Sequence, residues 1–225
     1  MSRFEDMHDA VVSAEIHDIT AARMTRSSPV LEEAWRYWNA KRVGGDLPRR
    51  DALDPRAMQL ILGHAMILDR VRHGTVRVRV GGRVPNALMG METRGLPIRA
   101  FFDLLQRGDA AEIVERAFDA PATVEFDLVS DGDEGSVTAR MLVLPLLDRE
   151  GAVSKALAVL VPGRLTTDGP RRFRIARHHV SPVRLPPRAP APLPDPAPPT
   201  AGRRPAVGGD VPVRRRPGSH LRLVQ

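Results

Sequence analysis

Cysteine is absent from the 225-residue chain. Its absence excludes disulfide bonds, metal sites built on thiolates and catalysis by a cysteine nucleophile. Aromatic residues are also scarce, at 4% of the sequence, so a core must be built mainly from Leu, Val, Ile, Ala and Met. With 42% hydrophobic residues, the chain still has enough apolar side chains for one sizeable core.

Long apolar runs are missing too. The longest, Met141–Leu147 and Ala156–Val161, are far shorter than the about 20 residues that a membrane-spanning helix needs. The N-terminus is acidic and has no apolar stretch after a basic start, so it does not resemble a secretory signal. We therefore expect a soluble, cytoplasmic protein without a transmembrane segment.

Lysine is nearly absent, because Lys41 and Lys155 are the only two among 34 basic residues. Heavy use of Arg together with Ala, Gly and Pro reflects GC-rich coding, so a single arginine is weak evidence for an anion site. The net charge of +7 is unevenly spread. Residues 1–162 carry 21 basic and 24 acidic side chains, for −3, whereas residues 163–225 carry 13 Arg and 3 Asp, for +10. The basic character therefore belongs to the C-terminal part.

The sequence divides into three parts. Residues 1–28 are polar with a weak helical pattern, and we expect them to be loosely ordered or helical. Residues 29–163 have the periodic apolar pattern of a folded domain with a leading helix. Residues 164–225 hold many of the prolines and two basic clusters, Arg171–Arg177 and Arg214–Arg216. This composition predicts a disordered basic tail.

A helix is predicted at 28–43, where Ser28 suits the N-cap and Pro29 the first helical position. Both tryptophans, Trp35 and Trp38, lie on its apolar stripe. The stripe predicts that the helix docks on a surface. Core packing is the simplest role for the two rings, and a homodimer or partner contact and stacking on a ligand are the alternatives.

Five strands are predicted by alternating or continuous apolar residues. They are His64–Val71, Thr75–Val80, Thr123–Val129, Ser136–Leu144 and Val153–Val161. The turn Arg72-His73-Gly74 joins the first two into a hairpin, and the last strand, apolar on both faces, is expected to be central. A short helical piece at Val84–Met89 and a longer helix at Asp109–Ala120 lie between the second and third strands.

Several short motifs accompany this order of elements. They are Trp35 with Trp38, Leu47-Pro48-Arg49-Arg50, Asp54-Pro55, Arg77-Val78-Arg79-Val80-Gly81-Gly82, Gly90, Arg94-Gly95 and Leu142-Val143-Leu144-Pro145-Leu146. As a set they resemble a divergent bacterial PAS domain family, the PAS_5 type, whose members are often small stand-alone proteins. The resemblance implies an α+β fold in which a five-stranded antiparallel sheet and flanking helices form a pocket. It also implies sensing or protein interaction without catalytic residues.

PAS domains hold flavin, haem or small acids, and the residues narrow this choice. A flavin domain of the cysteine-adduct type is excluded, because the chain has no cysteine. Haem-binding PAS domains of the oxygen-sensing type present a histidine from the long helix. The long helix predicted here contains no histidine, so we do not expect haem to bind in that way. His64 and His73 flank the first strand, where a surface or turn role is simpler than iron ligation. His178 and His179 cannot both face one metal from a regular element, so we predict no metal site.

The periodic pattern of each predicted element shows which side chains face the interior, and these are the candidates for a ligand pocket. They are Met66, Leu68, Val78, Leu88, Phe118 and Phe126. The same parity is expected of plain core residues, so the two roles are not distinguished at this point. The sequence shows no Ser/His/Asp arrangement, no phosphate-binding loop and no paired-carboxylate motif, so we expect no enzymatic activity.

The expected function is a sensory or signalling module that binds a small molecule or a regulatory protein. It would act by shape change or by rearrangement of a homodimer. One alternative is an adaptor with a filled core and no ligand. Another is a nucleic-acid- or membrane-associated regulator that acts through the basic tail, although a solvated tail without a function explains the same residues.

Overall fold

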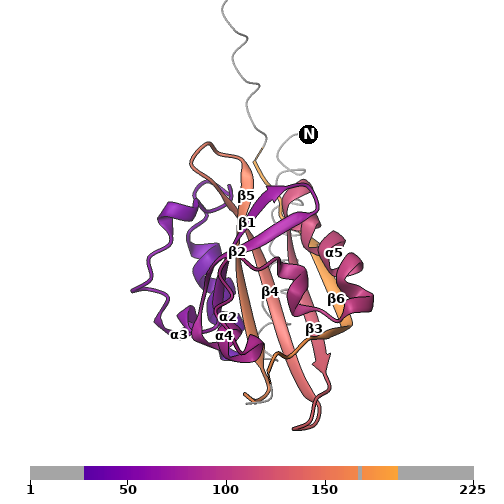
Figure 1. Cartoon of the computed structure of the whole chain (residues 1–225). Helices are drawn as coiled ribbons and strands as arrows, with labels where there is room; N and C mark the ends of the chain where they lie inside the picture. Colours follow the sequence, from indigo (N-terminus) through magenta and orange to yellow (C-terminus); the bar gives the residue numbers. More distant parts are fainter. Residues whose placement is uncertain (1–27, 167–168, 187–225) are drawn as a thin grey trace, which may run out of the picture. The chain divides into compact units, whose positions relative to one another are not determined.

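The computed structural model describes residues 28–166 and 169–186. Within them, six strands form one sheet in the order β2-β1-β5-β4-β3-β6 (Figure 1). The strands are β1 (Ala65–Arg72), β2 (Thr75–Gly81), β3 (Ala122–Ser130), β4 (Val137–Leu147), β5 (Val153–Pro162) and β6 (Arg174–Pro182). All neighbouring strands are antiparallel. The predicted α+β class with an antiparallel sheet is confirmed.

Helices pack on both faces of this sheet (Figure 1). They are α2 (Pro29–Ala40), α3 (Gln59–Leu62), α4 (Arg83–Met89) and α5 (Arg107–Asp119), with the 3-10 turns η1 (Arg50–Ala52), η2 (Ile98–Phe101) and η3 (Leu104–Gln106). Side chains of α4, η2 and α5 join the core on one face, here the inner face. Side chains of α2 and α3 join the core on the opposite, outer face.

The two central strands are buried on both faces. In β4, Met141 and Val143 belong to the inner core, whereas Leu142 and Leu144 belong to the outer core. This follows from the period of two along a strand, because successive side chains point to opposite faces. β5 lies between β1 and β4, as its apolar sequence predicts.

The helix boundaries differ slightly from the predicted ones. The leading helix ends at Ala40 rather than near residue 43, and Ser28 caps it by accepting a hydrogen bond from the Val30 N–H. The long helix begins at Arg107 rather than at Asp109, which lies in its first turn. The hairpin is confirmed, with Gly74 in the left-handed region at φ 72°.

The sixth strand was not predicted. The sequence places residues 174–182 in a disordered tail, but the structure pairs them with β3 along the edge of the sheet. Phe173, just before β6, is fully buried, and Ile175 and Val180 pack against the inner core. The register shifts between Asp127 and Leu128. This irregularity breaks the period of two in an Arg- and His-rich segment, which is why the alternation was not visible.

The predicted basic cluster at 171–177 is not a uniformly solvated one. Arg171 is only 1% exposed, and its guanidinium donates hydrogen bonds to the Gly135 carbonyl oxygen (2.9 Å) and to Thr166 Oγ1 (3.1 Å). Arg174 pairs with Asp131 at 2.8 Å. Composition reports charge but not partners, so the sequence did not show these contacts. The cluster at Arg214–Arg216 and the segment 1–27 lie outside the described residues.

Candidate functional site

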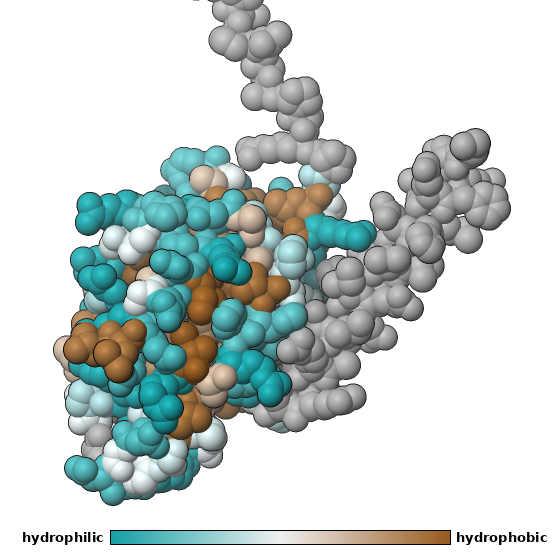
Figure 2. Space-filling view, turned by 90° about the vertical axis from the view of Figure 1, so that its right-hand side faces the viewer, coloured by the Kyte–Doolittle hydropathy of each residue, from teal (hydrophilic) through white to brown (hydrophobic). Residues whose placement is uncertain are grey.

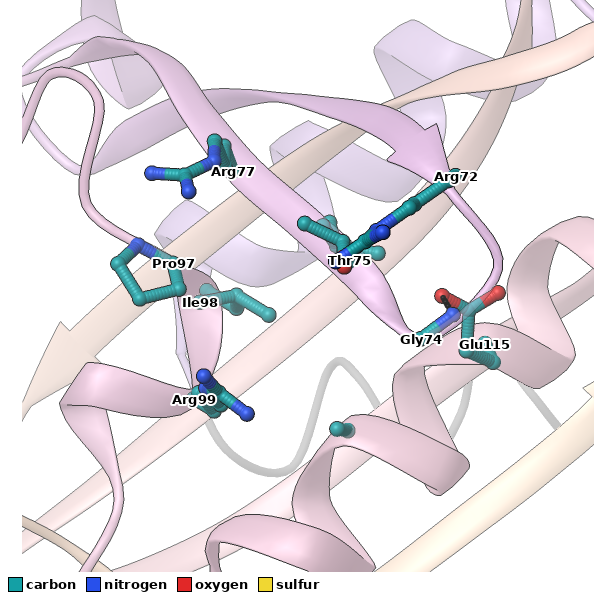
Figure 3. Close-up of a pocket in the computed structure, with 10 residues that line it drawn as sticks. Arg72, Gly74, Thr75, Arg77, Pro97, Ile98, Arg99 and Glu115 are labelled. Atoms are coloured by element: carbon teal, nitrogen blue, oxygen red, sulfur yellow. Dashed lines mark hydrogen bonds between the residues drawn. The ribbon is translucent and has the colours of Figure 1, made fainter.

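A small cavity of about 120 Å³ opens beside the β1–β2 hairpin (Figure 3). We call it the hairpin cavity. Its walls come from the hairpin, from the segment around η2 and from α5. The lining side chains include those of Arg72, Thr75, Arg77, Pro97, Arg99 and Glu115. Three separate segments of the chain therefore meet at one site.

The hairpin cavity lies at the edge of β2, near the segment that pairs with this strand. The Val78 N–H donates to the Leu96 carbonyl oxygen (2.9 Å), and the Gly95 N–H donates to the Val78 carbonyl oxygen (2.7 Å). Strand geometry directs the backbone groups of Val76, two residues earlier, toward the same edge. The cavity thus adjoins an edge where the backbone of β2 faces outward.

Two arginines of the hairpin cavity are positioned by neutral acceptors. Arg72 Nε donates to Thr75 Oγ1 (3.3 Å), and an Nη of Arg77 donates to the Gly95 carbonyl oxygen (2.9 Å). The side chain of Arg99 makes no hydrogen bond or ion pair within residues 28–166 and 169–186. None of these contacts supplies a negative charge, so within the described residues the three exposed guanidinium groups have no carboxylate as an ion-pair partner.

The single carboxylate of the hairpin cavity already has a positive partner. Glu115 is 4% exposed, and its Oε2 lies 2.8 Å from Arg70 Nε. These atoms are close but not aligned as a hydrogen bond, so the contact is an ion pair. The other oxygen accepts the Gly74 N–H at 2.8 Å (Figure 3). Glu115 therefore joins α5 to the hairpin turn, and within the described residues it forms no ion pair with Arg72, Arg77 or Arg99.

The same network contains a group of potential metal ligands. Ligand atoms of His73, Glu115 and Asp119 lie within 4.8 Å of one another. Arg70, however, contacts both carboxylates. A cation would have to displace this guanidinium, so the arrangement suits arginine better than a metal ion.

The six predicted pocket residues come together in the inner core. Met66, Leu68, Val78, Leu88, Phe118 and Phe126 all belong to one cluster, and each is at most 4% exposed. None of the six lines the hairpin cavity. A ligand among them would require packed side chains to separate, so their role as a ligand pocket stays a prediction.

The two tryptophans pack on their own sheet. Trp35 and Trp38 are 8% and 0% exposed, and their ring centroids stack 5.4 Å apart. Both belong to the outer core under α2. Because both rings are buried, they offer almost no surface to a second chain. A homodimer or partner contact through them stays a prediction.

The histidines singled out in the sequence occupy strand and turn positions. His64 Nδ1 lies 3.0 Å from the Leu160 carbonyl oxygen beside β1. His178 and His179 are opposite Phe126 and Glu125 in the β3–β6 register. Consecutive strand residues face opposite sides of a sheet, so these two imidazoles diverge.

The described residues form an α+β domain in which helices pack over the inner face of an antiparallel sheet with the strand order β2-β1-β5-β4-β3-β6. The sequence matches a family described as PAS domain over residues 26–161, which is more than half of the chain. The protein therefore belongs to the PAS domain family. Domains of this family are in general non-catalytic modules for sensing or interaction. No curated protein matches the chain. None of the helices in the described residues has the length and apolar character that a membrane span requires.

Proposed function

We propose that this PAS domain is a non-catalytic sensory module whose input is a small anion bound in the hairpin cavity. One observation carries the proposal: Arg72, Arg77 and Arg99 line the cavity, and none of them forms an ion pair with a carboxylate within the described residues. Charge-assisted hydrogen bonds from guanidinium groups are the strongest that proteins offer to carboxylate and phosphate oxygens.

The size of the hairpin cavity limits the ligand class. Drug-sized ligands and organic cofactors occupy about 300–1,000 Å³, which exceeds the about 120 Å³ found here. Inorganic phosphate or a short carboxylate fits this space, whereas flavin and haem do not. The proposed signal is therefore a small metabolite-type anion.

The position of the hairpin cavity supports a shape change as the output. Arg72 and Arg99 belong to the hairpin and to η2, and the ion pair of Glu115 with Arg70 connects the hairpin to α5. An anion shared by Arg72 and Arg99 would draw the hairpin and η2 together. That movement would act on the contacts of Glu115, and so on the position of α5 against the sheet.

Anion titration by isothermal calorimetry tests this function. Phosphate and acetate are added to the full chain, to Arg99→Ala and to the control variant Arg94→Ala, which removes an exposed arginine outside the cavity. We expect Arg99→Ala to weaken binding about tenfold or more, because it removes a charge-assisted hydrogen bond. Equal weakening by Arg94→Ala would indicate general charge screening and contradict the site.

An adaptor that binds a partner protein without a ligand is the second candidate function. The packed inner core favours it, because the six residues predicted from the sequence to line a ligand pocket already fill the interior. Figure 2 shows apolar surface among hydrophilic residues on the side where α5 and β6 lie. Leu104 and Leu105, in η3 directly before α5, are 72% and 91% exposed. Native mass spectrometry of freshly purified protein separates the two functions, since a retained ligand adds mass and an adaptor shows none.

A further inference from the structure

A second cavity, of about 260 Å³, lies on the outer face of the sheet near the end of β2. We call it the connector cavity, because much of its wall comes from the connector between α2 and β1. The apolar side chains around it belong to Leu53, Pro55, Met58, Leu62, Ile67 and Val80. Leu53, Met58 and Ile67 are buried, whereas Leu62 and Val80 are 46% and 52% exposed and form the rim.

Close packing at Gly82 shapes one wall of the connector cavity. A Cβ atom on this glycine would lie 2.5 Å from the Gly63 carbonyl oxygen and 2.6 Å from that of Leu62. The approach is fixed by hydrogen bonds from the Gly82 N–H to the Ala65 carbonyl oxygen and from the Val84 N–H to the Gly63 carbonyl oxygen, both 2.8 Å. The end of α3 is thus locked against the end of β2 beside the cavity.

Arg50 is the one charged side chain among the described residues that line the connector cavity. It belongs to the motif Leu47-Pro48-Arg49-Arg50, and its side chain forms no ion pair or hydrogen bond within the described part of the chain. Arg50 also borders a neighbouring hollow, whose carboxylates are those of Asp51, Asp69, Asp148 and Glu150. Asp51 pairs with Arg49 (3.5 Å) and Asp69 with Lys155 (3.1 Å). Two of these acids therefore already have cationic partners.

We propose that the connector cavity binds an amphipathic acid, with its apolar chain among Met58, Leu53 and Ile67 and its carboxylate on Arg50. An apolar enclosure with one placed charged group is the usual composition of a small-molecule site. The site is separate from the hairpin cavity, and neither proposal depends on the other.

The volume sets the chain length of the acid. An apolar protein cavity of about 150 Å³ accommodates benzene, so about 260 Å³ suits an acyl chain of roughly six to ten carbons. Each methylene group that enters the cavity is expected to raise the affinity about fourfold, until the cavity is full. Longer chains gain nothing further from its walls.

The test measures binding of butanoate, hexanoate, octanoate and decanoate to the full chain, below their micelle concentrations. Octan-1-ol serves as the uncharged partner of octanoate. We expect affinity to rise from butanoate to octanoate, and octan-1-ol to bind about tenfold more weakly than octanoate. Arg50→Gln should lower the octanoate affinity about tenfold and leave the octan-1-ol affinity unchanged.

Two control variants test whether the loss of octanoate binding is specific to Arg50 and the connector cavity. Arg56→Ala removes an exposed arginine from the same connector but outside the cavity lining, and it should leave octanoate binding unchanged. Arg99→Ala removes one of the three arginine charges of the hairpin cavity and should also leave octanoate binding unchanged. Met58→Trp fills the connector cavity and should abolish binding of both octanoate and octan-1-ol, with folding confirmed by circular dichroism.

Three outcomes would overturn the proposal. One is equal binding of octanoate and octan-1-ol that Arg50→Gln does not change. Another is no binding of any acid in the series. The third is that Arg50→Gln and Leu62→Ser alter sedimentation of the protein but not octanoate binding, which would assign the surface to a contact between copies. Absence of phosphate binding to the full chain would refute only the proposed function of the hairpin cavity.

Discussion

The indole Nε1 of Trp38 donates a hydrogen bond to the carbonyl oxygen of Pro145, with 2.8 Å between the two atoms. The donor belongs to α2 and the acceptor to β4, near the middle of the sheet. Both groups are buried, so neither has water as a replacement partner. This contact fixes the leading helix to a central strand that follows it by more than one hundred residues.

Replacing Trp38 by Phe should destabilise the domain while keeping a ring in the outer core. The change leaves the Pro145 carbonyl oxygen without its donor, and we expect the free energy of unfolding to fall by about 1–3 kcal/mol. Urea denaturation measures the change. Arg36→Ala on the exposed side of α2 is the control and should cost less than about 1 kcal/mol. Equal midpoints for the wild type and Trp38→Phe would show that the hydrogen bond contributes nothing.

A methyl group added at Gly82 should have the opposite effect to one added at Gly108. At Gly82 the new Cβ would overlap the backbone oxygens of Gly63 and Leu62, and we expect a loss of about 1–3 kcal/mol. At Gly108, in the first turn of α5, nothing lies within 4 Å. Gly108→Ala should therefore stabilise the protein by about 0.4–1 kcal/mol. Thermal melting of both variants checks the prediction, and a raised melting temperature for Gly82→Ala would contradict the close packing.

Truncation after residue 186 should leave the fold intact, and truncation after residue 163 should not. The shorter chain lacks β6 and the buried side chains of Phe173 and Arg171. Its β3 edge and part of its inner core would be exposed. Circular dichroism and gel filtration of the two truncated proteins measure the difference.

Truncation after residue 186 also tests whether the part of the basic tail beyond β6 binds DNA. Removing residues 187–225 leaves the sheet complete, so a loss of salt-sensitive DNA binding in that protein would belong to the tail alone. DNA binding that survives the truncation would refute the tail as the binding element.

Stability at acid pH should depend on Asp148, in the turn between β4 and β5. Its pKa lies below the ordinary value of 3.8, because the carboxylate accepts a hydrogen bond from Ser154 Oγ and others from the N–H groups of Ala152 and Glu150. A lowered folded-state pKa means that the folded protein binds this proton less tightly than the unfolded chain. The stabilisation is therefore complete above about pH 4–5 and is lost as the pH falls through the lowered value.

Asp148→Asn should lower the stability at neutral pH, and the loss should shrink as the pH falls through the lowered pKa of Asp148. Ser154→Ala removes the largest cause of the shift and should reduce the pH dependence. Urea denaturation across the pH range checks both variants. A constant difference between the wild type and Asp148→Asn at every pH would contradict this role.

Elements with strong local patterns were predictable from the sequence. Strict alternation identified β2 and β3, and the apolar runs identified β4 and β5, because burial imposes those periods directly on the residues. The set of short motifs indicated the PAS family, because its residues lie at caps, turns and core positions along the whole domain. The inward side of Met66 and Phe126 also followed from parity alone.

What the sequence did not reveal depends on contacts between distant segments. Arg99 and Arg72 look like any other arginine in a chain rich in them, and only the fold brings them to one cavity. Arg50 was visible as part of a motif, but its position over an apolar cavity requires β1, β2 and α3 together. Glu115 was the one residue of the cavity with a local sequence signal, because it is a carboxylate among the apolar residues of α5. In the structure it is buried with them.

The strand order also bears on how the domain forms during synthesis. β1 and β2 leave the ribosome early, yet the second neighbour of β1 is β5, which emerges only after β3 and β4. The first hairpin must therefore wait, with one side of β1 unpaired, while most of the domain is still being translated. An unfinished nascent chain would expose that strand to other chains, and slow translation between β2 and β5 would lengthen the exposure.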